Sequence, residues 1–396
     1  MDFALLKKSD YNRNIMKEVG PKRVLHVMRS LEAGGIGAFI MNVYRTIDRS
    51  QIQFDFAITS DGMGVFGPEI EQMGGRIFFI YNEGNRNIID GIRQIFNLYM
   101  VCKKNRYDAV HCHYYYGNAY FLLCAKLAGV RKLVSHCHTA KTLHTNFFKQ
   151  AFEFVSRRIL LKVGTDFLGC ADAATVFLYG EKAFKSGKAK TLYNGIDYNI
   201  WNIDNFDIEK LRLAYGLKSE KVAIFVGRME EVKNPIYALR VIKEVYGHEP
   251  DIRMFFVGTG SLDSEVDRFI RDNKMSGYVT RMPQDANIRE LQALADVMIA
   301  PSLREGLSIA FIEAQKMNTY IVTSDAVSDE VDMGLCSFLN LEKLEDWVEC
   351  VLWHFCGKDK RSISKHYEDF DVNTTVSNLL DIYFGDEFHS VMSRPK

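Results

Sequence analysis

The segment Val297–Gln315, VMIAPSLREGLSIAFIEAQ, contains the unit from which the fold is predicted. It begins with the short apolar run VMIAP, passes through the polar turn Arg304–Gly306 and continues with a helical pattern of apolar residues. A buried strand that leads directly into a helix is typical of proteins with parallel sheets. Similar units recur along both halves of the chain, so we predict an α/β fold.

Short apolar runs mark the strands that we expect for two open sheets in series. The polar stretch Tyr193–Asp207, rich in Asn and Asp, separates the two halves and suits an exposed hinge. The expected strands are residues 24–28, 54–59, 76–79, 109–112, 132–136 and 166–169 in the first half and 221–227, 253–258, 278–282, 297–301 and 320–324 in the second. The expected parts are a leader over 1–22, a Rossmann-like domain over 23–195, a second over 196–370, and a helical segment over 371–396 that could pack back on the first domain.

Composition excludes several classes of function. The chain has 396 residues, which suggests two domains, and its 50 basic and 50 acidic residues cancel, so no overall field attracts nucleic acid. The eight cysteines include no C-x-x-C pair, which favours reduced thiols in the cytoplasm. The first residues do not form a signal peptide. No run approaches the roughly 18 apolar residues that span a bilayer, so we expect any membrane contact to be peripheral.

Two strand-to-helix turns of the second half carry candidate ligand-binding residues. Ligands of open α/β sheets collect beyond the carboxyl ends of strands, where free N–H groups at a helix start favour phosphate. Glu305, in the turn with Gly306, and Glu313, in the helix, could bracket a polyhydroxylated ligand, or they could be solvated carboxylates. Arg228 and Lys233 could neutralise a diphosphate, or they could be ordinary surface cations.

The glycine-rich loop of the first half does not fit a dinucleotide site. MRSLEAGGIGAFIMN follows the first strand, but Gly34, Gly35 and Gly37 do not give G-x-G-x-x-G, which argues against a nicotinamide cofactor. These glycines could bring the loop close to the same ligand from the opposing domain, or they could simply form a turn.

Four histidines lie near the ends of two expected strands, in His111-Cys112-His113 and His136-Cys137-His138. The spacings typical of zinc sites are absent, so we predict no metal site. His138, with His113 close behind it, could hydrogen-bond to substrate hydroxyls or a leaving group, or it could be a satisfied histidine at the core edge.

A basic amphipathic segment, NFFKQAFEFVSRRILLKV at Asn146–Val163, also has two interpretations. It could lie on a membrane surface, or it could pack on its own domain with a solvated basic face, which is the commoner case.

In combination, these segments resemble glycosyltransferase family 4, the retaining GT-B enzymes that build polysaccharides, glycolipids and lipopolysaccharide cores. The resemblance covers about Val24–Phe384 and looks closest to members that assemble bacterial exopolysaccharide or capsule. It is carried by RVLHVMRSLEAGGIGAFIMNVYR, DAVHCHYYYGN, LVSHCHTA, YNGID, VGRMEEVKNP, VGTGSL and PSLREGLSIAFIEAQ.

The resemblance implies two Rossmann-like domains that face each other across a cleft. A nucleotide-diphosphate sugar, with a UDP-sugar favoured, would bind the second domain, and a saccharide or lipid-linked saccharide acceptor would bind largely the first. No cofactor or metal is obligatory in the family. The residues implied on the reacting side are His138 and Glu305. The resemblance places Arg228 and Lys233 on the pyrophosphate and Glu313 on the ribose. The full set implied for donor binding is Gly35, Arg228, Lys233, Gly306, Leu307, Ser308 and Glu313.

The chain departs from the family pattern at Asn318 and Tyr320, where Gly and Pro are common, and at Gln284, where a glycine often follows the strand. The implied mechanism is same-face attack with the leaving phosphate as base, and the alternative is that Glu305 acts as the nucleophile. The alternatives are another GT-B enzyme, such as an epimerase or an inverting transferase, and a degenerate protein that only binds sugar nucleotides.

Overall fold

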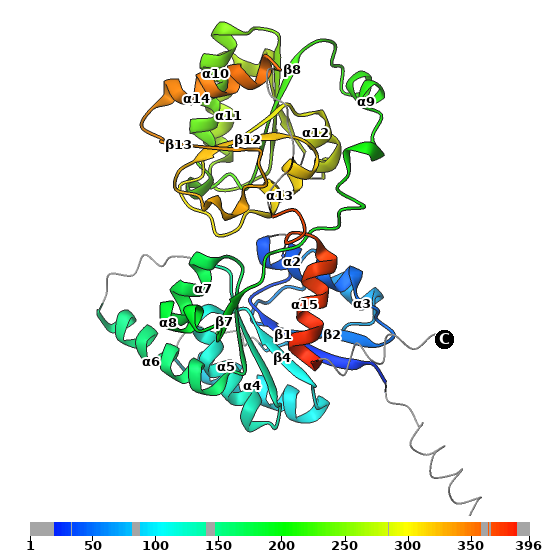
Figure 1. Cartoon of the computed structure of the whole chain (residues 1–396), viewed down its shortest axis with the longest axis vertical. Helices are drawn as coiled ribbons and strands as arrows, with labels where there is room; N and C mark the ends of the chain where they lie inside the picture. The colour runs from blue at the N-terminus through cyan, green and yellow to red at the C-terminus, as the bar shows by residue number, and fades with distance from the viewer. Residues whose placement is uncertain are drawn as a thin grey trace, which may run out of the picture.

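Two parallel sheets form the framework of the protein, as the alternation of strand and helix patterns predicted. The computed structural model describes residues 20–32, 34–80, 88–139, 147–283, 285–357, 363 and 366–385. The strand order is β3-β2-β1-β4-β5-β6-β7 in the first sheet and β10-β9-β8-β11-β12-β13 in the second. Figure 1 shows the two domains stacked along the long axis. Most of the expected leader and Gln284 lie outside the described residues.

All strand pairs within the two sheets are parallel. The first sheet consists of β1 (Lys22–Met28), β2 (Ile52–Ile58), β3 (Ile77–Phe79), β4 (Ala109–Cys112), β5 (Lys132–Cys137), β6 (Asp166–Gly169) and β7 (Ala189–Thr191). The second consists of β8 (Lys221–Val226), β9 (Ile252–Val257), β10 (Val279–Met282), β11 (Val297–Ala300), β12 (Tyr320–Ser324) and β13 (Cys336–Leu339). Because β1 begins at Lys22, the end of the expected leader is part of the first strand.

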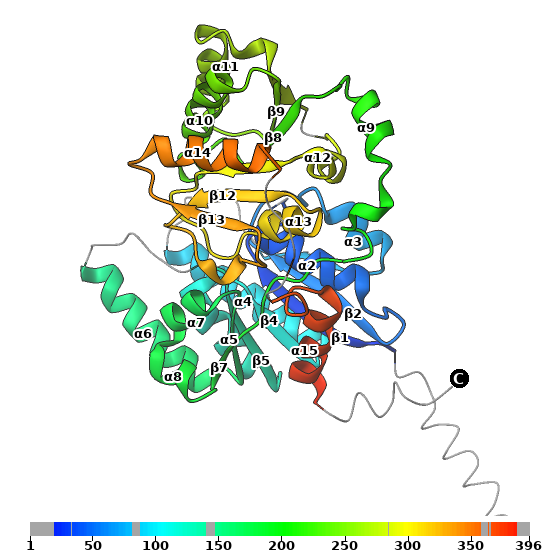
Figure 2. The same cartoon turned by 45° about the horizontal axis from the view of Figure 1, so that its top comes forward.

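Helices cover both sheets, which buries the central strands on both faces (Figure 2). Those of the first half are α2 (Gly35–Thr46), α3 (Gly67–Gln72), α4 (Ile88–Asn105), α5 (Asn118–Leu127), α6 (Phe147–Val163), α7 (Asp172–Tyr179) and α8 (Glu181–Lys185). Those that follow are α9 (Ile208–Ala214), α10 (Pro235–His248), α11 (Asp263–Asp272), α12 (Ile288–Leu294), α13 (Ile309–Lys316), α14 (Leu344–Phe355) and α15 (Val372–Phe384). Among the described helices, none is both long and apolar enough to cross a bilayer.

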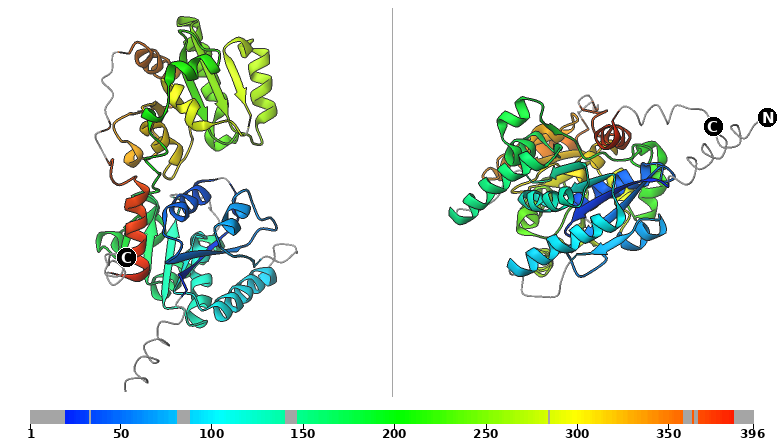
Figure 3. Two further views of the ribbon diagram at one scale, coloured as in Figure 1. Left: turned by 90° about the vertical axis from the view of Figure 1, so that its right-hand side faces the viewer. Right: turned by 90° about the horizontal axis from the view of Figure 1, so that it is seen from below.

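The chain passes between the two domains twice, and the two crossings lie side by side. Ile196, on the outward crossing, pairs in parallel with Asp371 on the return, and its N–H donates to Phe370 O at 2.9 Å. After the return, α15 packs on α2 of the first domain (Figure 3), and the Tyr383 hydroxyl lies 2.5 Å from Nδ1 of His111. The C-terminal helix is therefore part of the first domain's packing.

Each sheet has a switch point at which the strand order reverses. It lies between β1 and β4 in the first sheet and between β8 and β11 in the second. Loops that leave such a pair of strands diverge to opposite faces of the sheet and open a crevice for ligands. The predicted glycine loop follows β1, whereas Arg228 and Glu305 follow β8 and β11. The topology therefore places three of the predicted segments at ligand-binding edges.

Candidate functional site

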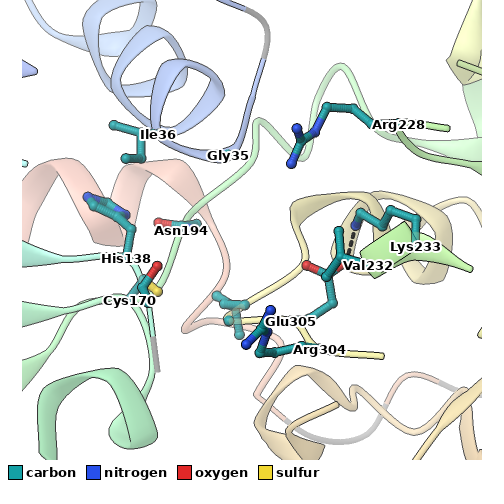
Figure 4. A pocket seen from close by; sticks show the side chains of 13 residues that line it. Gly35, Ile36, His138, Cys170, Asn194, Arg228, Val232, Lys233, Arg304 and Glu305 are labelled. Carbon is teal, nitrogen blue, oxygen red and sulfur yellow. Dashed lines mark hydrogen bonds and ion pairs between the residues drawn. The ribbon is translucent and has the colours of Figure 1, made fainter. Parts of the chain in front are cut away.

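A cavity of about 550 Å³ lies between the carboxyl ends of the two sheets. Figure 4 shows that side chains from both domains point into it. The first domain contributes Gly35, Ile36, His138, Thr139, Cys170 and Asn194, and the second contributes Arg228, Val232, Lys233, Arg304, Glu305, Gly306 and Leu307. Seven of the nine residues predicted from the sequence are in this lining, and Ser308 and Glu313 are not.

On the second domain, an ion pair joins the loop that carries Lys233 to the loop that carries Glu305. Nζ of Lys233 forms an ion pair with the carboxylate of Glu305, and the Ser302 hydroxyl donates to the same carboxylate at 3.3 Å. The side chains of the pair retain only 19% and 15% of their exposure. Burial, with the nearby Arg228 charge, lowers the pKa of Lys233 to about 8, while the Glu305 carboxylate favours the charged ammonium. An anionic ligand would stabilise that ammonium further.

Two glycines that follow β9, Gly258 and Gly260, allow the chain to pack closely against the loop that carries Arg228. A Cβ on Gly258 would lie 2.0 Å from the carbonyl oxygen of Gly227, and Gly258 has a φ of +125°, which only glycine adopts readily. A Cβ on Gly260 would lie 2.4 Å from Met229 O. The VGTG segment therefore packs directly behind Arg228. The sequence pattern included this segment in the family resemblance but gave it no role.

The helix α13 begins at the cavity, and Glu313 lies further along it. Glu313 is partly exposed, and desolvation by the surrounding protein raises the pKa of its carboxyl group to about 8. Among the residues that the structure describes, no donor hydrogen-bonds to this carboxyl group. Gln315 anchors the helix, because its amide donates to Val331 O at 2.9 Å and accepts from Met333 N–H at 2.7 Å. At the end of α13, Asn318 has a φ of +61°, a conformation that glycine adopts most readily and asparagine tolerates.

The glycine loop of the first domain leaves room in the cavity. A Cβ on Gly34 or Gly35 would meet no atom within 4 Å, whereas one on Gly37 would lie 2.4 Å from Glu32 O. Gly35 therefore borders open space, and Gly37 is required by the packing of α2. The sequence pattern alone did not separate these two roles.

His138 belongs to a cluster of buried imidazoles behind the cavity. Its Nε2 lies 2.9 Å from Nδ1 of His113, which confirms that His113 is close behind it. The other members are His26, His111 and His136, on β1, β4 and β5. Burial lowers the pKa of His138 to about 3, so its ring is neutral at physiological pH.

Two groups within this cluster have the geometry to hold a metal ion. Nitrogen atoms of His26, His111 and His113, and of His113, His136 and His138, lie within 4.8 Å of one another. Neither group includes a carboxylate to balance a buried dication. The absence of a metal site stays a prediction.

The two domains also touch outside the cavity lining. The Glu330 carboxylate, from the second domain, accepts hydrogen bonds from the N–H groups of Asp172 at 2.6 Å and Ala173 at 3.4 Å. These groups start α7, where the helix dipole favours a negative charge. Within the lining, a Cβ on Gly306 would lie 3.1 Å from His138 O, so the two domains also approach closely at the cavity itself. Nothing in the local sequence distinguishes Glu330 from the other acidic residues of the chain.

A second cavity, of about 730 Å³, lies on the first domain and shares Ile36 and Thr139 with the first. Its lining mixes aromatic and polar residues, namely Arg29, Thr59, Ser60, Asp61, Asp90, Gly91, Gln94, His113, Tyr114 and Tyr115. Polar groups beside aromatic rings are a surface that suits a polyhydroxylated ligand.

Comparison with known proteins agrees with this geometry. The model "Glycosyltransferase Family 4" matches residues 33–199, and the model "Glycosyl transferases group 1" matches residues 220–353. The putative glycosyltransferase EpsF of Bacillus subtilis is 29% identical over 371 residues, which cover 91% of this chain and 96% of EpsF. An Escherichia coli UDP-Gal:alpha-D-GlcNAc-diphosphoundecaprenol alpha-1,3-galactosyltransferase is 26% identical over 76% of this chain and 81% of its own.

Among solved structures, HepE of Anabaena in complex with UDP superimposes with a TM-score of 0.73. The match covers 91% of this chain and 98% of HepE at 17% identity, so it concerns the fold.

Proposed function

Because this chain belongs to glycosyltransferase family 4, we propose that it transfers a sugar, with retention of anomeric configuration, from a nucleotide-diphosphate sugar to a saccharide or lipid-linked saccharide acceptor. Its place would be in polysaccharide biosynthesis, because the chain also matches the capsular polysaccharide biosynthesis glycosyltransferase CapH of Staphylococcus aureus. The observation that carries the proposal is the single cavity that brings Arg228, Lys233 and Glu305 of one domain to His138 and Gly35 of the other.

The donor diphosphate would lie against Arg228 and Lys233. Two cations at a strand end oppose the negative charge that grows on the leaving pyrophosphate as the sugar bond breaks. The N–H groups at the start of α13, near Gly306 to Ser308, would add donors to the phosphate. Glu305 would then accept hydrogen bonds from the sugar hydroxyls, and Glu313 from the ribose. A UDP-sugar is favoured because HepE, which shares the fold, was solved with UDP.

The residues that line the cavity bear on how retention would be achieved. Among the described residues of its lining, Glu305 is the only carboxylic acid, and Lys233 holds it on the second domain. A double-displacement mechanism needs a free carboxylate close to the reacting carbon. We therefore infer same-face attack, in which an oxygen of the departing phosphate accepts the proton of the acceptor hydroxyl. The second cavity, which continues from the first past Ile36, would hold the acceptor.

A lipid-linked acceptor would bring the enzyme to the inner face of the cytoplasmic membrane, and α6 is the element that fits such contact. Phe147 and Phe154 are 75% and 56% exposed, although large apolar side chains are usually buried. Lys149 and Arg158 are exposed on the same helix, and cations of this kind attract anionic lipid headgroups. The second half of α6 packs on the domain through the buried Leu160.

Binding and product analysis would test the proposal together. A thermal-shift screen of UDP-, GDP-, ADP- and dTDP-sugars should show stabilisation by one nucleotide class, lost in Arg228→Ala and kept in Arg289→Ala, an exposed arginine of α12. With the stabilising donor and an acceptor, the anomeric configuration of the product should be that of the donor. An inverted product, or epimerisation without acceptor, would instead support another GT-B enzyme. Binding without turnover would support a degenerate binding protein.

A further inference from the structure

Three neighbouring helices of the first domain carry a large share of the exposed apolar side chains. α5 packs against both α4 and α6, and the three lie together at the surface of the domain (Figure 1). Half of the large apolar side chains that are exposed among the described residues lie on these helices, namely Ile92, Phe96 and Met100 on α4, Leu127 on α5, and Phe147, Phe152, Phe154 and Val155 on α6. Because folding usually buries such side chains, their gathering here indicates a surface that binds another apolar surface.

On α4 the exposed apolar side chains form one stripe. Ile92, Phe96 and Met100 are spaced four residues apart, so they lie on one side of the helix, and they are 61%, 60% and 50% exposed. Leu98 and Cys102 are buried on the opposite side, where the helix packs on its own domain. The α4 stripe is therefore a second apolar side of the helix that folding leaves accessible to a partner.

The α4 stripe begins beside the second cavity, which the proposed function assigns to the acceptor. Asp90, Gly91 and Gln94, from the first turns of α4, line that cavity. Ile92 and Phe96 lie on the outer side of the same turns. A partner that covers the stripe would therefore lie next to the place where the acceptor enters.

The exposed apolar side chains of α6 lie near the same edge of the domain. Phe152 stacks on Tyr120 of α5, with ring centroids 5.6 Å apart. Tyr120 lies in the first turn of α5, a few residues after Tyr114 and Tyr115 of the second cavity. The apolar parts of α4 and α6 thus flank the part of the domain that forms this cavity.

The charges beside these side chains favour an anionic lipid surface as the partner. Arg93, Lys103 and Lys104 are exposed on α4, and Arg158 is exposed on α6. Asp90, the only acidic residue of α4, is buried. Exposed cations beside apolar side chains are typical of helices that lie on anionic membranes, whereas lysine is depleted at interfaces between proteins.

We propose that the α4 stripe is a second membrane anchor, which docks together with α6 on an anionic leaflet and holds the acceptor cavity beside the lipid headgroups. This rests on the proposed function, in which that cavity receives a lipid-linked acceptor. Packed helices lie roughly 8 to 10 Å apart, so α4 and α6, with α5 between them, are about 16 to 20 Å apart. Two contacts at this separation fix the tilt of the domain on the membrane, which a single helix does not.

Fluorescence quenching by brominated lipid tests the α4 contact on the full-length protein without donor or acceptor. Phe96→Trp should give fluorescence that brominated phosphatidylglycerol vesicles quench, above the background of the three native tryptophans. Leu213→Trp is the matched control, because Leu213 is 78% exposed but lies on α9, away from the first domain's helices, and it should not be quenched. Binding to the vesicles without quenching at position 96 would leave α6 as the sole anchor and overturn the proposal.

Sedimentation with phosphatidylglycerol vesicles measures the strength of the contact. The double variant Ile92→Ser, Phe96→Ser should bind about tenfold more weakly or worse, because two large apolar side chains no longer enter the membrane interface. Leu213→Ser should bind like the wild type, and both variants should keep the wild-type Tm, since the replaced side chains are exposed. Unchanged binding of the double variant contradicts the proposal. A dimer in lipid-free solution that the double variant converts to monomer also contradicts it, because the stripe would then join two copies of the chain.

Turnover separates the docking from the proposed function. The acceptor probes are one saccharide carried on a polyprenyl diphosphate in vesicles and the same saccharide as a water-soluble octyl glycoside. The α4 double variant should lose about tenfold in kcat/KM on the first and keep its activity on the second, because Ile92 and Phe96 lie outside the cavity linings. Equal losses on both acceptors would refute a docking role. If the wild type uses neither acceptor, the proposed function fails for these acceptors, and the quenching at position 96 still decides whether α4 meets the membrane.

Discussion

The desolvated carboxyl group of Glu313 should make donor binding depend strongly on pH. Its pKa is raised to about 8 by burial, so it is mostly protonated at pH 7 in the empty enzyme. If ribose hydroxyls donate hydrogen bonds to it, the donor binds the ionised form, and its pKa falls in the complex. Affinity must then increase as pH rises from 6 toward 8, and binding must release a proton.

The size of the pH effect on the dissociation constant follows from the fraction of Glu313 carboxyl groups that are ionised. With a pKa of about 8, roughly one molecule in ten is ionised at pH 7 and about one in a hundred at pH 6. The dissociation constant should therefore rise about tenfold between pH 7 and pH 6, equivalent to about 1.4 kcal/mol. Above pH 8 this gain ends, and Lys233, whose pKa is also about 8, begins to lose its charge. We expect the tightest binding near pH 8.

Isothermal titration with a UDP-hexose would measure both the affinity and the proton. A UDP-hexose is preferred to UDP, because the terminal phosphate of UDP itself titrates near pH 6. The heat of binding in buffers of different ionisation enthalpy should give close to one released proton at pH 7. Glu313→Gln should lose most of the pH dependence between pH 6 and 7 and bind about tenfold more weakly at pH 8, because the amide replaces a charge-assisted hydrogen bond. Glu349→Gln, on the exposed face of α14, should behave like the wild type.

A clear result would refute this reasoning. If the affinity of Glu313→Gln for the donor still increases about tenfold from pH 6 to pH 7, another group causes the pH dependence in that range. If the wild type shows no pH dependence and releases no proton, Glu313 does not contact the donor in its ionised form.

Three further predictions follow from the cavity and its borders. Gly35→Ala should raise the KM for the donor without lowering Tm, because its Cβ would enter open space, whereas Gly37→Ala should lower Tm through its contact with a backbone carbonyl. Glu330→Ala should remove about 1 to 2 kcal/mol from the contact between the domains, raise the KM for the donor and increase the radius of gyration in scattering. The double variant Phe147→Ser, Phe154→Ser should sediment less with anionic vesicles while keeping activity on a water-soluble acceptor; unchanged sedimentation would exclude α6 as the contact.

The sequence predicted the central strands well and missed two edge strands. Interior strands such as β8 are buried along most of their length and read as continuous apolar runs. The missed strands, β7 and β13, lie at sheet edges. β7 has only three residues, and β13 is half-buried along its whole length, so neither gives a strong pattern.

The candidate site was predictable where chemistry and topology coincide. Arg228 and Glu305 follow strands at a switch point, and a charged residue at such a place is a strong indication of a ligand. The contact of Glu330 with α7 and the hydrogen bond between His26 and His113 join residues that are far apart in the sequence. No local pattern encodes such pairs, so only the folded structure reveals them.

In the proposed function, the ion pair between Lys233 and Glu305 would couple the binding of the diphosphate to the binding of the sugar. While the cavity is empty, each charge neutralises the other, and neither is left buried without a partner. A diphosphate carries more negative charge than one carboxylate and also meets Arg228, so it competes effectively for Lys233. Its arrival would draw Lys233 toward the phosphate, and the sugar hydroxyls would then donate hydrogen bonds to the Glu305 carboxylate. In the proposed function, Glu305 would therefore accept hydrogen bonds from the sugar only when the pyrophosphate is bound, which would favour sugars attached to a nucleotide over free sugars.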